Sequence, residues 1–236
     1  MAREELTGRP RNRFRGEQLW GEDEDRMTKK GIGSEVAGHG DLPAGSPEPV
    51  REPAFAMSQL PASSLLLNPT PWPMTTRTNQ LTLTRTAHLD DLDEVNAMHA
   101  RCSLESRFAR YHTARQAVTA REWGHLCDRS NGTTLVTVPL HEPTRIIAVT
   151  HLLRTSVPHV RELGLLVEDS WHGQGLGTTL AHYTVDLART HTLDCHEITT
   201  MTGSGNHRML SILLGLHARV TGRNGPTVDT VIHVEA

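Results

Sequence analysis

The stretch from Val160 to Leu187 constrains the fold most, because it reads as a strand, a glycine-rich loop and an amphipathic helix in succession. The loop has glycine at every second position, at Gly173, Gly175 and Gly177. Glycine adopts positive φ without strain and lets backbone N–H groups approach a ligand closely. A helix that begins in such a loop directs unpaired N–H donors and its positive dipole end at one place. The stretch therefore predicts an anion site suited to a phosphate or pyrophosphate.

Two other interpretations of the loop stay open. A Rossmann-type dinucleotide site requires GxGxxG at the start of a βαβ unit, with an acidic residue about 20 positions further on. Here GxG is present, but the third glycine has the wrong spacing and the loop follows several expected strands. The second alternative is a glycine turn with a purely structural role.

Composition divides the chain in two. The first 80 residues hold nine of the thirteen prolines, both lysines and charge runs such as that from Glu22 to Asp25. Such a segment has too little apolar surface to offset the entropy of ordering it. We expect a disordered low-complexity tail over residues 1–79, either a docking segment or one without a role, and a folded domain over residues 80–236. A translation start at Met74 also fits, because the next residues lead directly into the first expected strand.

Charge and cysteine content exclude several classes of protein. The net charge is −3, without a sustained basic stripe, which is evidence against nucleic acid as the main partner. The three cysteines are scattered and odd in number, as in a reducing compartment. No apolar run approaches the ~18 residues of a membrane span, and no signal peptide is recognised. We expect a soluble, cytoplasmic protein with no membrane partner. Histidines are numerous but lack metal-ligand spacing, so we predict no metal site.

Apolar periodicity predicts the elements of the domain. The expected strands cover residues 81–85, 133–138, 145–153, 160–167, 194–201 and 227–234. One expected helix begins near Asp90, and a short one lies within 101–111 after a turn. The others cover 121–127, 176–187 and 206–215. We expect antiparallel pairing in the middle of the domain and parallel pairing where single helices separate the later strands. This order belongs to the α/β (α+β) class.

Three segments resemble motifs of the GCN5-related N-acetyltransferase (GNAT) superfamily. Leu165-Leu166-Val167 and the loop from His172 to Gly177 resemble motif A, whose loop usually starts with Arg or Gln where this chain has His172. Asn206, which begins a later helix, is similar to the next motif. The segment from Ser103 to Tyr111 resembles the SPESRYxRF stretch of bacterial protein-acetyltransferase GNAT domains, with Leu104 in place of proline. The resemblance covers about residues 80–236.

The resemblance implies a GNAT fold: a mixed central sheet of about six to seven strands, helices on both faces and a splayed strand that binds acyl-CoA. It implies acetyl-CoA as the donor, whose pantetheine arm hydrogen-bonds the backbone of that strand like an added strand. The residues implied in donor binding are Leu165, Val167, His172, Gly173, Gln174, Gly175, Leu176, Gly177 and Asn206.

Glu162 resembles the glutamate that serves the family as general base. It lies five residues before Val167, so a regular strand would direct the two to opposite faces unless a bulge, typical of the family, restores the side. A solvated strand glutamate is the alternative. The family usually has a tyrosine that protonates the leaving thiolate, and this chain has Leu213 at that position. The proton could come from Ser211, His207 or water, or no acid is needed.

The resemblance therefore implies an N-acetyltransferase that moves an acetyl group from acetyl-CoA to a primary amine of a small molecule or protein. The alternative is a catalytically weak acyl-CoA-binding sensor, indicated by Leu213 and His172. Glu105, Arg107 and Arg110 either contact the acceptor or lie on a solvated surface helix. The sequence does not select the acceptor, and a homodimer stays open.

Overall fold

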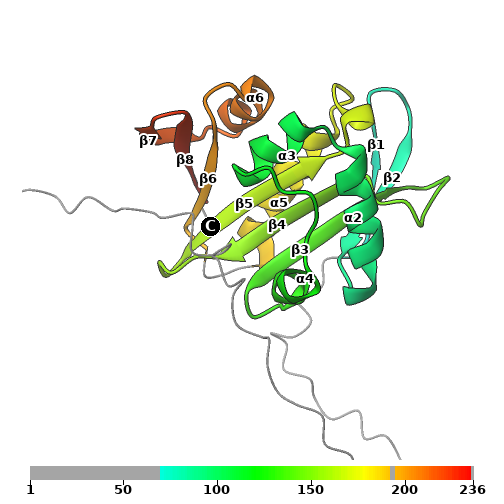
Figure 1. Cartoon of the computed structure of the whole chain (residues 1–236). Coiled ribbons are helices and arrows are strands. Elements are labelled where there is room, and N and C mark those ends of the chain that lie inside the picture. The colour runs from blue at the N-terminus through cyan, green and yellow to red at the C-terminus, as the bar shows by residue number, and fades with distance from the viewer. Residues whose placement is uncertain (1–69, 192–194, 235–236) are drawn as a thin grey trace, which may run out of the picture. The chain divides into compact units, whose positions relative to one another are not determined.

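The computed structural model describes residues 70–191 and 195–234, which form one mixed sheet with helices on both faces (Figure 1). The strands are β1 (Trp72–Thr75), β2 (Leu81–Thr86), β3 (Gly132–Pro139), β4 (Ala148–Arg154), β5 (Val160–Val167), β6 (Glu197–Gly203), β7 (Arg219–Asn224) and β8 (Thr227–His233). The helices are α2 (Leu92–Arg101), α3 (Leu104–Tyr111), α4 (Ala120–Cys127), α5 (Leu176–His191) and α6 (His207–Gly215), with 3-10 turns η1 (Leu89–Asp91) and η2 (Asp169–Trp171). None of these helices is both long and apolar enough to cross a membrane.

The sheet has the strand order β1-β2-β3-β4-β5-β6-β8-β7. Strands β1 to β5 pair antiparallel in sequence. The antiparallel pairing of β2 to β5 and the parallel pairing of β5 with β6 are as the sequence predicts. The expectation of parallel pairing for the last strand is wrong, since β8 runs antiparallel to β6. The reason is β7, which forms a hairpin with β8 and so reverses its direction. The edge strand β7 is polar and mostly exposed, so it has no apolar alternation to reveal it.

Strand β1 lies within the residues that composition assigned to the tail. It pairs with β2 from Trp72↔Thr84 to Thr75↔Leu81, so the sheet has eight strands rather than six to seven. Met74 is buried, and the ring of Trp72 stacks on that of Tyr183 in α5 with centroids 4.1 Å apart. Proline is tolerated in an edge strand, which explains why this Pro-rich segment still joins the sheet. The expected tail over residues 1–69 lies outside the described residues and stays a prediction.

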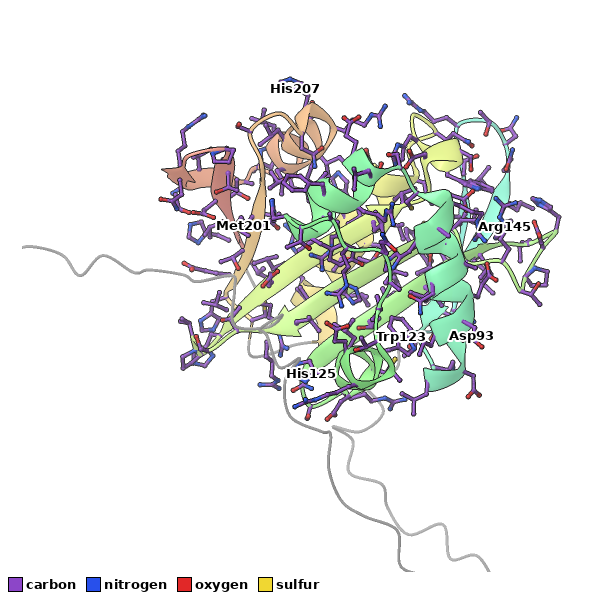
Figure 2. The ribbon with its side chains drawn as sticks, viewed as in Figure 1. Asp93, Trp123, His125, Arg145, Met201 and His207 are labelled. Atoms are coloured by element: carbon purple, nitrogen blue, oxygen red, sulfur yellow. The ribbon has the colours of Figure 1, made fainter. Side chains whose placement is uncertain are left out.

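Alternate residues of β5 face opposite layers of helices. Leu163 joins Ala181 and Val185 of α5 in an apolar core cluster. Gly164, its neighbour, lies under the side chain of Arg110 in α3. Helices α2, α3 and α4 therefore cover one face of the sheet and α5 the other (Figure 1). On the α4 side, Trp123 is buried and its indole N–H donates to the carbonyl oxygen of His88 at 3.0 Å (Figure 2).

Strands β5 and β6 separate soon after they meet. They pair only from Val160↔Glu197 to Glu162↔Thr199, whereas β5 continues along β4 as far as Val167. Among the described residues, no strand therefore pairs with the edge of β5 beyond Glu162. This divergence gives the splayed strand that the family resemblance implies, and it lies directly before the glycine loop.

Candidate active site

The glycine loop connects η2 to α5 and takes backbone conformations that require glycine at two positions. Gly173 has φ +74° and Gly175 has φ +85°, a region in which other residues are strained. Leu176, the first residue of α5, is buried and anchors the helix start. Gly177 already has ordinary helical φ, and a methyl group there would make normal contacts with Leu165 and Ile212. The loop thus needs glycine for conformation at 173 and 175, not at 177.

The backbone N–H groups from Gly173 to Thr178 have no hydrogen-bond acceptor within the part of the chain that the structure describes. The first bond of the helix start runs from Thr179 N to the carbonyl oxygen of Gly175 at 3.0 Å. Unpaired donors at a helix start, together with the positive end of the helix dipole, attract an anion. The loop and the first turn of α5 thus form a cradle of donors beside the open edge of β5.

The side chain of His172 is turned into the protein. One ring nitrogen, Nε2, lies 2.8 Å from the carbonyl oxygen of Val167, and Nδ1 lies 2.7 Å from Nη1 of Arg208 in α6. Because a guanidinium only donates, Nδ1 accepts and Nε2 carries the proton that bonds Val167. Where the family pattern has Arg or Gln, this chain thus has a histidine held beside an arginine from another helix.

The turn between β1 and β2 lies directly on the glycine loop. The backbone N–H of Arg77 donates to the carbonyl oxygen of Gln174 at 2.9 Å, and its guanidinium donates to that of Gly173. The hydroxyl of Thr78 donates to Oε1 of Gln174 at 2.6 Å. The side chain of Gln174 is thus bonded to another residue of the protein. Sequence reasoning missed Arg77, because composition placed it in the tail and no local pattern signals a contact so far along the chain.

A buried carboxylate fixes the end of β5 where the loop begins. Glu168 accepts hydrogen bonds from Arg101 at 2.8 Å, Arg145 at 2.6 Å and the hydroxyl of Ser170 at 2.7 Å. Burial alone would raise the pKa of Glu168, but the bonds from Ser170, Arg101 and Arg145 outweigh it and lower that pKa below the usual value. The carboxylate is therefore charged at neutral pH, and it ties the loop to α2 and to the segment before β4. Sequence reasoning did not single out this cluster either.

Glu162 lies at the fork between β5 and β6, at the last paired position opposite Thr199. The expected bulge is absent from β5: its register with β4 is continuous from Ala148↔Val167 to Arg154↔Arg161. Uninterrupted alternation therefore directs Glu162 to the face of Gly164 and α3, opposite that of Val167. Glu162 still lies beside the open edge, because that edge begins at its own position in β5. The backbone groups of the edge lie in the plane of the sheet, and the side chain of Glu162 projects from that plane on the α3 side.

Every second residue of β5 turns its backbone to the open edge. The carbonyl oxygens of Arg161, Leu163 and Val167 accept bonds from Thr199, Thr200 and His172 at 3.2, 3.5 and 2.8 Å. Because bonding direction alternates along an antiparallel strand, Leu165 belongs to the same set. The backbone groups of Leu165 thus face the gap that opens beyond Glu162.

The residues expected on α6 have mainly structural contacts. Asn206 caps the helix by accepting from Met209 N at 3.2 Å, and its amide donates to the hydroxyl of Thr202 at 3.0 Å. Leu213 is buried in the core cluster that also contains Ala181 and Val185 of α5. Ser211 and His207 are exposed, and His207 lies at the outer side of α6 (Figure 2).

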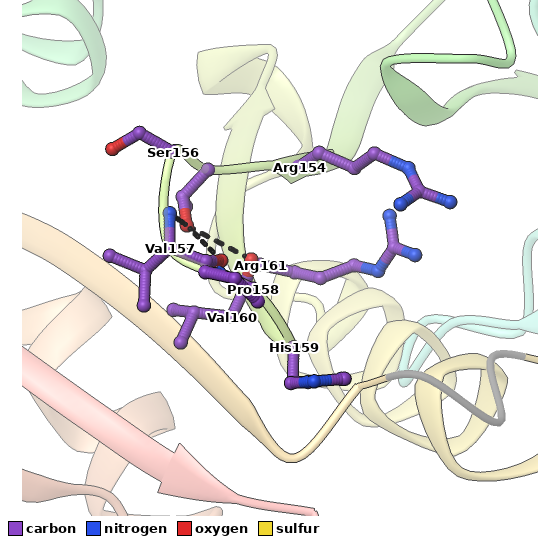
Figure 3. Close-up of a pocket in the computed structure, with 8 residues that line it drawn as sticks. Arg154, Ser156, Val157, Pro158, His159, Val160 and Arg161 are labelled. Atoms are coloured by element: carbon purple, nitrogen blue, oxygen red, sulfur yellow. Dashed lines mark hydrogen bonds between the residues drawn. The ribbon is translucent and has the colours of Figure 1, made fainter.

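A cavity of about 290 Å³ lies at the β4–β5 turn and not at the loop. The backbone and side chains of residues 154–161 line it, and the guanidinium groups of Arg154 and Arg161 extend side by side at its edge (Figure 3). It occupies the start of β5, at the other end of the strand from Val167. Within residues 70–191 and 195–234, no group of three or more His, Cys, Asp or Glu side chains could hold a metal ion.

Comparison with known proteins agrees with this geometry. The family model described as "Acetyltransferase (GNAT) family" matches residues 97–215, half of the chain. The chain therefore belongs to the GNAT acetyltransferase family, and its α+β sheet with helices on both faces is the GNAT fold. No curated protein matches the chain in sequence.

Solved GNAT structures share this fold at low sequence identity. The GNAT domain of S. lividans PAT is 14% identical, with 74% of this chain and 99% of that chain covered and a TM-score of 0.62. Ribosomal-protein-S5-alanine acetyltransferase from Vibrio fischeri is 15% identical, with coverage of 71% and 98% and a TM-score of 0.56. Spermidine N-acetyltransferase from Vibrio cholerae, in complex with CoA and spermine, is 14% identical, with coverage of 65% and 95% and a TM-score of 0.52.

Proposed function

We propose that this protein is an N-acetyltransferase that moves an acetyl group from acetyl-CoA to a primary amine. The run of unpaired N–H donors from Gly173 to Thr178, beside the open edge of β5, carries the proposal. A ligand that satisfies both features needs a phosphate group at one end and an extended polar arm at the other. Acetyl-CoA has a pyrophosphate and a pantetheine arm in that relation. A dinucleotide has no arm that would add to a strand edge.

The residues present fit such a donor. We assign the pyrophosphate to the loop from His172 to Gly177, with positive charge from Arg77 and Arg208 close by. We assign the pantetheine arm to the backbone groups of Leu165 and the N–H of Val167 at the open edge, since the carbonyl oxygen of Val167 is bonded to His172. Asn206 supports the site by holding the start of α6, which carries Arg208.

Acetyl-CoA supplies a thioester whose acyl carbon accepts a nucleophile. In the proposed step Glu162 takes the proton of the attacking amine, directly or through water, so that the neutral nitrogen bonds to the acyl carbon. The carbon–sulfur bond breaks, and the sulfur leaves as a thiolate that takes a proton from water. A backbone N–H at the β5 edge stabilises the oxyanion meanwhile. Because Leu213 is a core residue, no side chain at that position protonates the leaving sulfur.

A second candidate function rests on that same leucine. A domain that binds acyl-CoA without efficient turnover would need the cradle and the open edge but no acid. Binding of acetyl-CoA is therefore expected of both the sensor and the enzyme. Only a measurement of turnover distinguishes these two functions.

The test is release of free thiol from acetyl-CoA by the full chain with a panel of primary amines, with mass spectrometry of the products. Amine-dependent thiol release that falls in a Glu162→Gln variant is the expected result. Donor binding without amine-dependent thiol release would favour the sensor. Absence of both binding and release would refute the donor site itself.

A further inference from the structure

We infer that the acceptor amine carries an anionic group, in the simplest case a carboxylate, which Arg110 of α3 binds beside Glu162. This inference rests on the proposed function, because it names the acceptor for that same site. It concerns the face of the sheet that α3 covers, and the side chain of Glu162 lies on that face.

The guanidinium of Arg110 lies directly over Gly164 of β5. A Cβ built on Gly164 would collide with the guanidinium of Arg110, so the glycine provides the room for this side chain. Gly164 is two residues after Glu162, and alternate strand residues share a face. Arg110 therefore lies on the same face as Glu162, where the open edge of β5 begins. A group bound by Arg110 would be a neighbour of the proposed base.

No carboxylate in the part of the chain that the structure describes neutralises this arginine. Neither Arg110 nor its helix neighbour Arg107 forms an ion pair there, and the Nε of each is buried without a hydrogen-bond partner. Arginines elsewhere on this side of the sheet are paired: Arg115 with Glu122, and Arg101 with Glu168. Unpaired, partly buried cations are costly, and an anion supplied by a ligand would offset that cost.

The groups around Arg110 position it without supplying negative charge. Its guanidinium carbon lies 5.1 Å from the ring centroid of Tyr111, whose hydroxyl lies 2.8 Å from Nε2 of His99. Burial, and next the charges of Arg115, Arg107 and Arg110, lower the pKa of His99 to about 4, so it is neutral at pH 7. His151 of β4 lies opposite Gly164 of β5. Burial lowers its pKa, and the charge of Arg110 lowers it further. The cluster thus presents a planar, fixed guanidinium, the group that binds carboxylates in a bidentate manner.

The contact with Arg110 predicts a preference between matched amines. The probes are β-alanine, γ-aminobutyrate and δ-aminovalerate, each compared with the alkylamine of the same chain length. We expect the best amino acid to have a kcat/KM at least about tenfold above its alkylamine, since a hydrogen bond to a charged group has about that effect. Arg110→Met should abolish the preference by lowering the kcat/KM of the amino acid toward that of its alkylamine. Arg110→Lys should keep part of it, and Arg121→Met, on the exposed side of α4, should keep all of it.

A binding measurement makes the inference testable without turnover. The melting temperature of the CoA-loaded full chain should rise with the preferred amino acid and not with its alkylamine, and Arg110→Met should remove that rise. Gly164→Ala, which displaces Arg110 while leaving its charge in the chain, should act in the same direction. Equal rates or equal stabilisation for both members of every pair would overturn the inference while leaving the acetyltransferase proposal intact. Amino-acid-specific stabilisation without thiol release would support the anion site and refute the proposed transfer.

Discussion

Arg77 and Gly173 are joined by a hydrogen bond from guanidinium to carbonyl oxygen, although 96 positions separate them in the chain. The backbone N–H of Arg77 also donates a hydrogen bond to the carbonyl oxygen of Gln174. In a trans peptide the C=O of one residue and the N–H of the next point in opposite directions. Holding these two carbonyl groups against the β1–β2 turn therefore directs the N–H groups of Gln174 and Gly175 away from it, toward the proposed donor.

Removal of the Arg77 side chain should weaken donor binding. We expect Arg77→Ala to raise the Kd for acetyl-CoA about tenfold, because both a fixed peptide orientation and a positive charge are lost. Isothermal titration calorimetry measures this directly. Arg129→Ala, an exposed arginine before β3, is the matched control and should leave the Kd unchanged. An unchanged Kd in Arg77→Ala would show that the β1–β2 turn does not organise the loop.

The conformation of Gly175 predicts a second effect. Its φ of +85° costs a residue with a Cβ about 1–2 kcal/mol, and that Cβ would lie 3.3 Å from Cγ of Arg77. We expect Gly175→Ala to lower the free energy of unfolding by that amount and to reduce the stabilisation by acetyl-CoA. Gly205→Ala is the control, because a Cβ there meets nothing within 4 Å. Equal melting curves for the two variants with acetyl-CoA would contradict the role of this loop conformation.

Glu162 predicts a separation of binding from chemistry. Since a general base typically contributes 10²–10⁴-fold, Glu162→Gln should lower kcat/KM by about 10² or more and leave the Kd for acetyl-CoA within about twofold. The loss should be smaller at high pH, where more of the amine is already neutral. Asp93→Asn, at an exposed position of α2, is the control and should keep full activity. A Glu162→Gln enzyme with wild-type kcat/KM across pH would mean that this glutamate is a solvated strand residue.

The buried carboxylate of Glu168 predicts a pH-dependent contribution to stability. Because its folded-state pKa is lowered, the contribution is complete above the unfolded pKa of about 4.3 and is lost as pH falls through the folded-state pKa. Glu168→Gln removes the buried carboxylate that Arg101 and Arg145 share, although each keeps a more exposed partner, and should cost about 3 kcal/mol at pH 7. Urea unfolding of both proteins from pH 7 to pH 3 should show this difference shrink below pH 4.3. A constant difference over that range would refute the assigned pKa shift.

The stack of Trp72 on Tyr183 predicts that β1 contributes to the stability of the folded domain. We expect Trp72→Ala to lower the free energy of unfolding by about 2 kcal/mol, less than the roughly 3–5 kcal/mol of a buried tryptophan because this one is only partly buried. Trp72→Phe keeps a ring over Tyr183 and should recover about half of the loss. Thermal unfolding of the full chain measures both. If Trp72→Ala has the same melting temperature as the wild type, β1 does not contribute to the stability of the domain.

The sequence predicts best those parts of the fold that local patterns specify. Strand β5 and the start of α5 have the predicted bounds, because an apolar strand, three glycines and a helical apolar period follow one another directly. The polar strand β7 and the Pro-rich β1 are missed, since edge strands need no alternation of apolar residues. Missing β7 also inverted the predicted direction of β8.

The candidate site is only partly predictable for a related reason. The glycine loop and Glu162 stand out in the sequence, by pattern or by resemblance. Arg77 and Arg208 do not stand out, because they reach the loop from a turn and a helix that lie far from it in sequence. Arg110 is a candidate in the sequence only as one of three charged residues of its segment, and its place over Gly164 becomes visible in the structure. The bulge that the resemblance implied is not present in β5, because its register with β4 continues without a shift.

The most direct test of the donor site is the melting temperature of the full chain with acetyl-CoA and, separately, with NAD. A ligand at 100 times its Kd adds about 2.7 kcal/mol of stability, which is readily visible as a shift. We predict a rise with acetyl-CoA that Gly175→Ala and Arg77→Ala both reduce, and no rise with NAD. A chain that melts at the same temperature with and without acetyl-CoA would contradict the assignment of the Gly173–Thr178 donors to an acyl-CoA.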